Sequence, residues 1–292
     1  MQAVNLSERA MLAYIAVGLW SARKLDKKSS KKVTTDASAT ADAARVHKHL
    51  LASADEKLKA IQHVAGKARR LLDEHSSPWD DAGNRLVSNA KAIWLIGELR
   101  GIEQEFHAAV DDFVLDYPML RAQAVASLGS LANLDDYPEP DRVREKFSMR
   151  MSFTPLPQNF DDMRMGMSPE QAALLRQHYE ARIKEQHSRA LMSVWERLRE
   201  QIKHVLERLE PDEDGKRKRY RNTMMDNLRE TCAMVKSLNV FEDAELELVR
   251  NEVERTLCAF ETEQLRDNDL LAEQVRSDAN AILEKMKSLL GE

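Results

Sequence analysis

Phe147-Ser-Met-Arg-Met-Ser-Phe153 and Asp162-Met-Arg-Met-Gly-Met167 are the two stretches that decide the fold. In both of them apolar side chains fall on every second residue, which is the period of a half-buried strand. The residues between them include two prolines and an asparagine, which favour a reversal of direction. The sequence therefore predicts a β-hairpin, with strands at about 147–154 and 161–167, in an otherwise helical chain.

The most apolar stretch near the N-terminus, Met11 to Trp20, fits either a helix that is apolar on all sides or a strand buried on both faces. We favour a strand at about 11–20, because a two-stranded hairpin is marginally stable alone and needs a third strand or a helix against it. This stretch is too short to span a bilayer and lacks the basic start of a signal peptide. It predicts no membrane anchor.

The composition is that of a helical protein. Of the 292 residues, 32% are charged and only 5% are aromatic, with 9 glycines and 8 prolines, a profile typical of long helices and coiled coils. The net charge of −5 is too small to attract nucleic acid or an anionic membrane over the whole surface. Two cysteines are too few to stabilise the fold through disulfide bonds, so we expect reduced thiols and a cytoplasmic protein.

Two helices are predicted in the first half of the chain, at about 42–74 and 88–116, with apolar stripes at spacings of three and four. The short loop between them makes them an antiparallel helical hairpin. Before them, residues 26–40 are rich in lysine and predict an exposed loop. After them we expect a kink at Pro118 and a short helix near 139–146.

The second half begins with Ser168-Pro-Glu-Gln171, a serine cap followed by proline at the first helical position. The helix that starts there should continue to about Leu209, and a return helix should occupy 216–238. A final helix is predicted at about 242–290. Within the first of these helices, apolar residues at spacings of four and three form a coiled-coil seam that includes Leu191, Trp195 and Leu198.

The predicted fold class is mainly α with a small antiparallel β-sheet (α+β), in which long helical hairpins and a coiled-coil arm surround a central β-hairpin. We divide the chain into residues 1–167, the N-terminal helical hairpin with the small sheet, and residues 168–292, an antiparallel coiled-coil helical arm.

Sequence signatures of catalysis and of metal or cofactor binding are absent. The chain has no glycine-rich phosphate loop, no nucleophile elbow, no Cys-x-x-Cys and no His-Glu-x-x-His. His47 and His49 would face different sides of the helix predicted there. We therefore predict no catalytic residue, no metal and no cofactor.

The loop after the first helix contains Asp80 and Asp81 near His75 and Arg85, a group that suits acid-base chemistry. A structural role is simpler. In that interpretation one aspartate caps a turn, Arg85 pairs with a carboxylate and Trp79 closes the end of the helical hairpin.

Two basic clusters are candidates for nucleic-acid binding. The first consists of Lys216, Arg217, Lys218, Arg219 and Arg221, and the second of Arg23, Lys24, Lys27, Lys28, Lys31 and Lys32. Three acidic residues directly precede the first cluster and weaken its field, so a solvated helix start is the favoured interpretation there.

Protein contact is the other candidate role for exposed side chains. Flexible methionines on one face of a sheet form either an adaptable core or an adaptable binding surface. The residues that we select as candidate protein contacts are Trp79, Met163, Met165, Leu191, Trp195 and Leu198.

Several segments, in this order and over most of the chain, resemble an uncharacterised protein family of tailed bacteriophages and integrative mobile elements. They are Trp20-Ser-Ala-Arg-Lys24, Pro78-Trp-Asp-Asp81 with Gly83 and Arg85, Arg144-Glu-Lys-Phe147 and Ser152-Phe-Thr-Pro-Leu-Pro157. The family has no assigned activity, and the resemblance implies origin more than mechanism.

The resemblance also suggests partners, since relatives lie near MoxR-type AAA+ ATPases and von Willebrand A-domain proteins. Our first expectation is a non-enzymatic interaction or scaffold protein, an oligomer in the cytoplasm of a bacterial host cell, that binds protein partners and is an accessory to such an ATPase. The alternative is a nucleic-acid-binding accessory protein that uses the two basic clusters.

Overall fold

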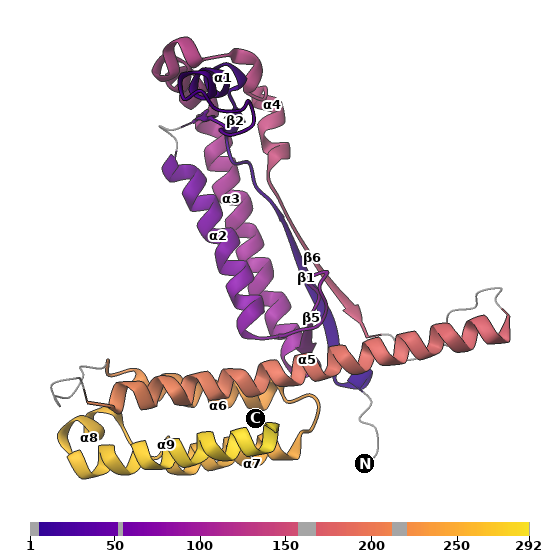
Figure 1. The fold of residues 1–292 in the computed structure, drawn as a ribbon, viewed down its shortest axis with the longest axis vertical. Coiled ribbons are helices and arrows are strands. Elements are labelled where there is room, and N and C mark those ends of the chain that lie inside the picture. Colours follow the sequence, from indigo (N-terminus) through magenta and orange to yellow (C-terminus); the bar gives the residue numbers. More distant parts are fainter. Residues whose placement is uncertain (1–5, 52–54, 157–167, 212–220, 292) are drawn as a thin grey trace. The chain divides into compact units, whose positions relative to one another are not determined.

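The computed structural model describes residues 6–51, 55–156, 168–211 and 221–291 (Figure 1). It is mainly helical with a small antiparallel sheet, which confirms the predicted fold class. The chain forms two compact units, each made of separated segments. Unit 1 comprises Met1–Tyr14, Leu72–Leu95 and Ser152–Glu292, and unit 2 comprises Ile15–Leu71 and Ile96–Met151. The sequence alone suggested a boundary after residue 167 instead.

The main sheet contains four strands in the order β4-β5-β1-β6. They are β1 (Ala10–Gly18), β4 (Ser77–Pro78), β5 (Arg85–Ser88) and β6 (Ser148–Pro155). The structure confirms the N-terminal strand, the strand predicted at 147–154 and their pairing. The return strand predicted at 161–167 lies outside the described residues.

β4 and β5 form a hairpin that the sequence did not predict, since residues 78–86 were expected only to turn. Gly83 lies in this turn with a φ of +89°, a conformation that L side chains rarely adopt. Ala10 on β1 pairs with Ser88 on β5 in antiparallel register.

The helices of unit 2 include two that the sequence placed incorrectly. The bounds are α1 (Lys27–Asp36), α2 (Asp55–Glu74), α3 (Asn89–Leu128) and α4 (Pro140–Val143), with short 3-10 turns at Gly129–Leu131, Leu134–Asp136 and Arg144–Lys146. The predicted loop at 26–40 is wrong, because Asp26 caps α1 by accepting a hydrogen bond from the Ser29 amide. The helix predicted from Asp42 is also wrong in its first part, where β3 (His47–His49) pairs with β2 (Arg23–Leu25).

The predicted helical hairpin is present in unit 2, where ion pairs join α2 to α3. Lys57 pairs with Asp112 at 2.9 Å, and Lys67 pairs with Glu105 at 2.8 Å. Because the order of the partners is opposite on the two helices, the helices run antiparallel. The expected kink at Pro118 does not end α3, which continues to Leu128.

Aromatic rings form the centre of unit 2. Phe113 of α3 lies 6.5 Å from Trp20, 5.8 Å from Tyr117 and 5.5 Å from Phe147, measured between ring centroids. Trp20 contacts Tyr117 as well, at 6.0 Å. Edge-to-face contacts of this kind add to the free energy gained by burying the rings. One cluster therefore joins the segment after β1, helix α3 and the residue before β6.

The buried hydroxyl of Tyr117 makes the free energy of unfolding of unit 2 depend on pH in the alkaline range. It donates a hydrogen bond to the Pro138 carbonyl at 2.8 Å, and burial raises the pKa of Tyr117 to about 12. An unfolded tyrosine ionises near pH 10. The folded state therefore holds this proton more tightly, so its contribution is complete below about pH 10 and disappears between about pH 10 and pH 12.

Between pH 10 and pH 12 we expect the free energy of unfolding to fall less steeply with pH for Tyr117→Phe than for the wild type. The loss in the wild type should exceed that in the variant by about 2–3 kcal/mol near pH 12. Urea unfolding of both proteins at pH 8 to 11.5 measures it. Equal slopes for the two proteins would contradict the assignment.

Unit 1 contains a helical bundle made of α5 (Pro169–Leu209), α6 (Met224–Leu238), α7 (Ala244–Thr256), α8 (Thr262–Asp267) and α9 (Asp269–Leu290). Ser168 and Gln171 form the predicted capping box at the start of α5. α5 packs against α6 and α9, and α7 packs against α6 and α9. The buried core residues include Leu198, Ile202, Leu228, Val235, Val249, Val253, Val275 and Ile282.

The single final helix predicted at 242–290 is wrong. Helix α7 ends at Thr256, and Asn268 starts α9 by accepting a hydrogen bond from the Leu271 amide. This interruption allows α9 to pack against both α5 and α7, which buries an apolar face that a straight continuation would leave exposed.

None of the helices within the described residues is long and apolar enough to cross a membrane.

Candidate functional site

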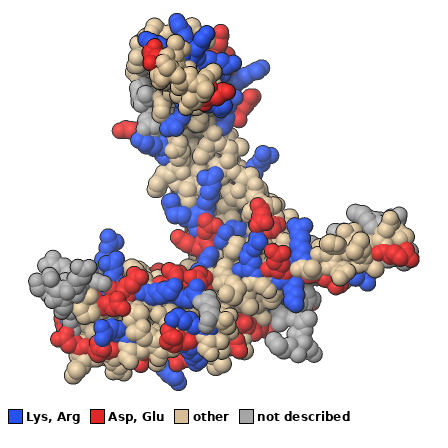
Figure 2. Space-filling view, viewed as in Figure 1, with Lys and Arg blue, Asp and Glu red and all other residues tan. Residues whose placement is uncertain are grey.

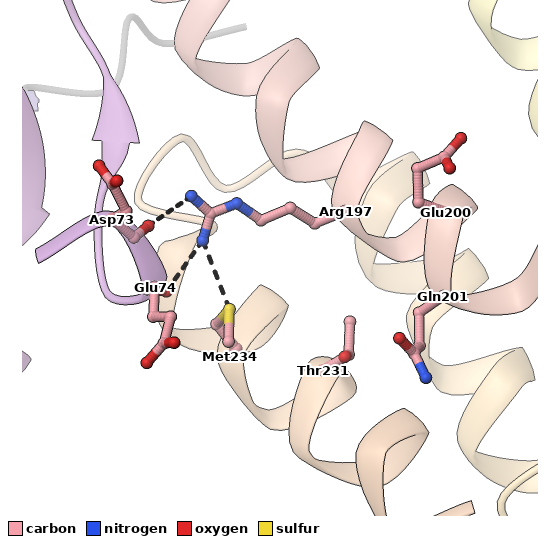
Figure 3. A pocket seen from close by; sticks show the side chains of 7 residues that line it. All are labelled: Asp73, Glu74, Arg197, Glu200, Gln201, Thr231 and Met234. Atoms are coloured by element: carbon pink, nitrogen blue, oxygen red, sulfur yellow. Dashed lines mark hydrogen bonds between the residues drawn. The ribbon is translucent and has the colours of Figure 1, made fainter. Parts of the chain in front are cut away.

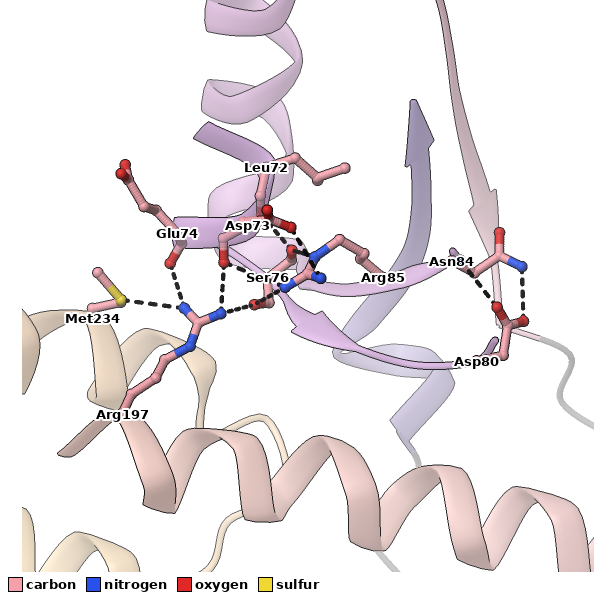
Figure 4. Close-up of polar contacts among 9 residues, drawn as sticks. All are labelled: Leu72, Asp73, Glu74, Ser76, Asp80, Asn84, Arg85, Arg197 and Met234. Carbon is pink, nitrogen blue, oxygen red and sulfur yellow. Dashed lines mark hydrogen bonds and ion pairs between the residues drawn. The ribbon is translucent and has the colours of Figure 1, made fainter. Parts of the chain in front are cut away.

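Two arginines in unit 1 bind the C-terminal end of α2 (Figure 4). The Arg197 guanidinium, from α5, donates to the carbonyls of Asp73 at 2.6 Å, Glu74 at 2.8 Å and Ser76 at 2.8 Å. Arg85 on β5 donates to the Ser76 hydroxyl at 2.6 Å and pairs with the Asp73 carboxylate at 3.0 Å. The last carbonyls of a helix lack partners within the helix and carry partial negative charge, so cations stabilise this end.

Both arginines of this contact are partly buried, and burial lowers the pKa of each. Burial, followed by the nearby charge of Arg85, lowers the pKa of Arg197. Burial also lowers the pKa of Arg85, against the opposing effect of Asp73. Three hydrogen bonds of Arg197 go to backbone oxygens and one to the Met234 sulfur at 3.4 Å, so this side chain holds α5 on the end of α2 and also contacts α6.

A pocket of about 420 Å³ lies beside Arg197 (Figure 3). Asp73, Glu74 and Arg197 line it together with Glu200 and Gln201 of α5 and Thr231 and Met234 of α6. A second pocket, of about 540 Å³, shares Glu74, Gln201, Thr231 and Met234 and extends to His75 and Lys91. We call these two adjoining cavities the α5–α6 pocket.

Trp94 lies beside the wall of this pocket. Its ring contacts the His75 ring edge-to-face at 4.7 Å, and the Lys91 ammonium lies 5.2 Å from its centroid. Trp94 is nevertheless 42% exposed, and the neighbouring Ile93 is 85% exposed. Burial, with a smaller effect of the Lys91 charge, lowers the pKa of His75. The result is a partly exposed aromatic ring next to a concave surface whose lining includes Glu74, Glu230 and Lys91.

The group considered for acid-base chemistry is divided between two places. Asp80 accepts hydrogen bonds from the Asn84 amide and side chain within the turn. Asp81 pairs with Arg189 of α5 at 2.6 Å, and both aspartates line a separate pocket of about 270 Å³. His75, the expected base, lines the α5–α6 pocket instead. The structure therefore does not bring the three residues together.

Ligands for a metal do not gather in the described ranges, where no group of three or more His, Cys, Asp or Glu side chains is placed to hold an ion. The prediction for His47 and His49 is wrong in its geometry. They lie two apart on a strand, not on a helix, and therefore project from the same face of β3.

The two cysteines are free, as expected from the composition, but they are also neighbours. Cys232 on α6 is buried, whereas Cys258, which follows α7, is partly exposed. A hydrogen bond from the Cys232 thiol, opposed by burial, lowers the pKa of Cys258. The same contact, together with burial, raises the pKa of Cys232 above its usual range.

Three of the residues selected as candidate protein contacts have buried side chains. Trp79 is 3% exposed and packs with Ala10, Leu86 and Phe241. Trp195 and Leu198 belong to the bundle core, and Leu191 packs against it partly buried. A side chain buried in this chain presents no surface to a partner. Met163 and Met165 lie outside the described residues.

The second basic cluster is exposed in unit 2, with Arg23 and Lys24 on β2 and Lys27 and Lys28 on α1. The cluster Lys216, Arg217, Lys218 and Arg219 lies outside the described residues, and Arg221, which follows it, is exposed.

Sequence reasoning missed the two residues that define the site, Arg197 and Trp94. Arg197 donates to backbone carbonyls, which every residue has. The sequence therefore does not distinguish Arg197 from the other charged residues of α5. Trp94 offered a weak signal, since Lys91 precedes it by three positions and such pairs meet on a helix. A scan of protein-family models, a search of curated proteins and a search of solved structures each found no match to this chain.

Proposed function

We propose that this protein is a non-enzymatic interaction protein that binds a partner protein at the α5–α6 pocket of unit 1. One observation carries the proposal: Trp94, which is 42% exposed, contacts His75 in the wall of a cavity of about 540 Å³. Tryptophan is enriched among the residues that contribute most to binding at protein interfaces, and such residues sit next to pockets on the partner or on their own side.

The charges around the pocket favour one kind of partner. Glu74 and Glu230 line the cavity, and neither carboxylate forms an ion pair within the described part of the chain. Lys91 lies over the Trp94 ring, and burial lowers the pKa of His75. A partner segment with an apolar anchor side chain and flanking Lys or Arg residues would complement this surface.

The resemblance to phage and mobile-element proteins suggests which partners to test first, a MoxR-type AAA+ ATPase and a von Willebrand A-domain protein encoded by the same element. Binding of each purified candidate to immobilised wild type, Glu230→Lys and Trp94→Ala would be measured by interferometry. We expect at least one of them to bind the wild type, and the variants to bind at least about 10-fold more weakly.

Leu270→Ala is the matched control, because Leu270 on α9 is 84% exposed but lines none of these cavities. It should bind as the wild type does. Failure of both candidates to bind the wild type, or equal binding by all four proteins, would contradict the proposal.

A homo-oligomer stays a prediction of the sequence, and light scattering after size-exclusion chromatography tests it. We expect a mass above that of one chain for both the wild type and Trp94→Ala. If Trp94→Ala reduced the oligomer to single chains, the pocket would join copies of this chain and the proposed partner site would be wrong.

A further inference from the structure

The hairpin of β2 and β3 in unit 2 presents three exposed basic or imidazole side chains on one face. Its register places Arg23 opposite His49, Lys24 opposite Lys48 and Leu25 opposite His47. Directly opposite residues share a face, and so do residues two apart, so Arg23, His47 and His49 project together. All three are exposed. Lys48 belongs to the other face, where its nearly buried ammonium pairs with Asp136 at 2.6 Å.

Helix α1 follows β2 directly and adds a row of lysines. Its packed side is polar, since Ser30 and Thr34 are its buried residues and the Ser30 hydroxyl accepts a hydrogen bond from the Val46 amide at 2.9 Å. The four lysines of α1 occupy the first and second turns and are all exposed: Lys27, Lys28, Lys31 and Lys32. Lys and Arg side chains gather around this part of the chain in Figure 2.

This arrangement opposes the stability of α1 in two ways. The N-terminal end of a helix carries partial positive charge, yet the first turn of α1 contains lysines and no acidic residue. Two pairs of lysines are also four residues apart on the helix, a spacing at which like charges repel. Local conflicts of this kind between sequence and structure are expected at functional positions.

Asp26, the N-cap residue of α1, offsets part of this conflict, because its carboxylate lies at the positive end of the helix. Three other lysines of unit 2 form ion pairs: Lys48 with Asp136, Lys57 with Asp112, and Lys67 with Glu105. In contrast, within the described ranges no side-chain hydrogen bond or ion pair forms at five exposed cations of this face, namely Arg23, Lys27, Lys28, Lys31 and Lys32. These cations are therefore available to an anion from another molecule.

We infer that this face, formed by the exposed side of the β2–β3 hairpin and the lysines of α1, binds the phosphate backbone of double-stranded nucleic acid without reading its sequence. Lysine and arginine contacts to phosphates supply sequence-independent affinity by releasing counterions. This is a second activity, carried by unit 2 and independent of the partner site proposed for unit 1.

A duplex fits the face better than the alternatives do. Residues 21–49 contain no Phe, Tyr or Trp, and proteins that bind single strands stack bases on such rings. α1 has one exposed large apolar side chain, Val33. A helix that lies in a membrane surface needs a whole apolar face.

The test measures binding of two unrelated 30-base-pair DNA duplexes by fluorescence anisotropy between 50 and 200 mM salt. With about five phosphate contacts, the affinity of the wild type should fall about 500-fold over this range, equally for both sequences. The triple variant Lys27→Gln, Lys28→Gln, Lys31→Gln should bind at least about 10-fold more weakly at 100 mM salt. Its log-log salt slope should be shallower by about 2.7.

The control replaces three paired lysines, Lys67→Gln, Lys285→Gln and Lys287→Gln, which are also half exposed. It changes the net charge equally and should bind DNA like the wild type. The α1 variant should unfold at a temperature no lower than the wild type, because it loses charges that oppose the helix dipole. The unfolding temperature therefore shows whether weaker DNA binding comes from the loss of the binding site or from unfolding of the variant.

Four outcomes would overturn the inference. They are no duplex binding at 50 mM salt, equal weakening by both triple variants, tighter binding to a single strand than to the duplex, and tighter binding to vesicles with 30% phosphatidylserine than to DNA. Loss of binding on charge reversal at Arg217 and Arg219, with no effect of the α1 variant, would likewise assign the activity to the other basic cluster.

Discussion

Phe113→Ala should lower the free energy of unfolding of unit 2 by about 3–5 kcal/mol. Phe113 has no exposed surface and contacts three other aromatic rings, those of Trp20, Tyr117 and Phe147. Removing it leaves a cavity between segments that are far apart in the sequence, so the surroundings cannot collapse into it without moving several elements. Since domains are stable by only about 5–15 kcal/mol, the loss is a large share of the total.

Urea unfolding followed by circular dichroism, with hydrogen exchange of residues 96–120, measures this loss within unit 2. Leu115→Ala is the control on the same helix, because Leu115 is 78% exposed. It should change stability by less than about 0.5 kcal/mol. Similar values for the two variants would show that the ring cluster does not form as described.

Arg197→Met should destabilise unit 1 by about 2 kcal/mol. Methionine keeps the aliphatic part of the side chain, so the change removes mainly the guanidinium. The Glu74 carbonyl loses this donor, and those of Asp73 and Ser76 keep only the longer hydrogen bonds from Arg85, at 3.4 Å and 3.2 Å. Hydrogen bonds to charged groups contribute about 1.5–3 kcal/mol each when buried. Here water reaches part of the contact, so the sum is well below three times that value.

Arg189→Met is the comparison variant on the same helix. Arg189 is also on α5, but its partners are the exposed carboxylates of Asp81 and Glu185, and exposed pairs of this kind contribute about 0–1 kcal/mol. Thermal unfolding of both variants, with amide exchange of residues 72–78, distinguishes them. Equal stability of Arg197→Met and the wild type would mean that α5 is held on α2 by apolar packing alone.

The sequence predicted those parts of the fold whose side chains repeat with the period of their element. Alternation at 147–153 identified β6, and Ser168 with Gln171 identified the start of α5. It failed where burial does not follow hydrophobicity. Helix α1 has no apolar stripe because Ser30 and Thr34 fill its packed side, and β3, with the sequence His-Lys-His, has no apolar alternation.

The end of α7 was missed for a different reason. Apolar spacing continues from Val253 through Leu257, and the interruption after Thr256 depends on α9, which packs back on the bundle. The same dependence on distant segments hid the α5–α6 pocket. Its walls come from α5, α6 and the end of α2, so no local pattern contains it.

The central position of β1 in the sheet has a consequence for how the chain is made. Its two neighbours, β5 and β6, are both synthesised later. Ala10, for example, can pair with Ser88 only after β5 has been synthesised. Until Pro155 has left the ribosome, β1 has at least one free edge, and free strand edges recruit other chains. Closing such long loops is also slow. We therefore expect nascent chains that stop between β5 and β6 to aggregate and to need a chaperone, whereas chains released after β6 fold without one.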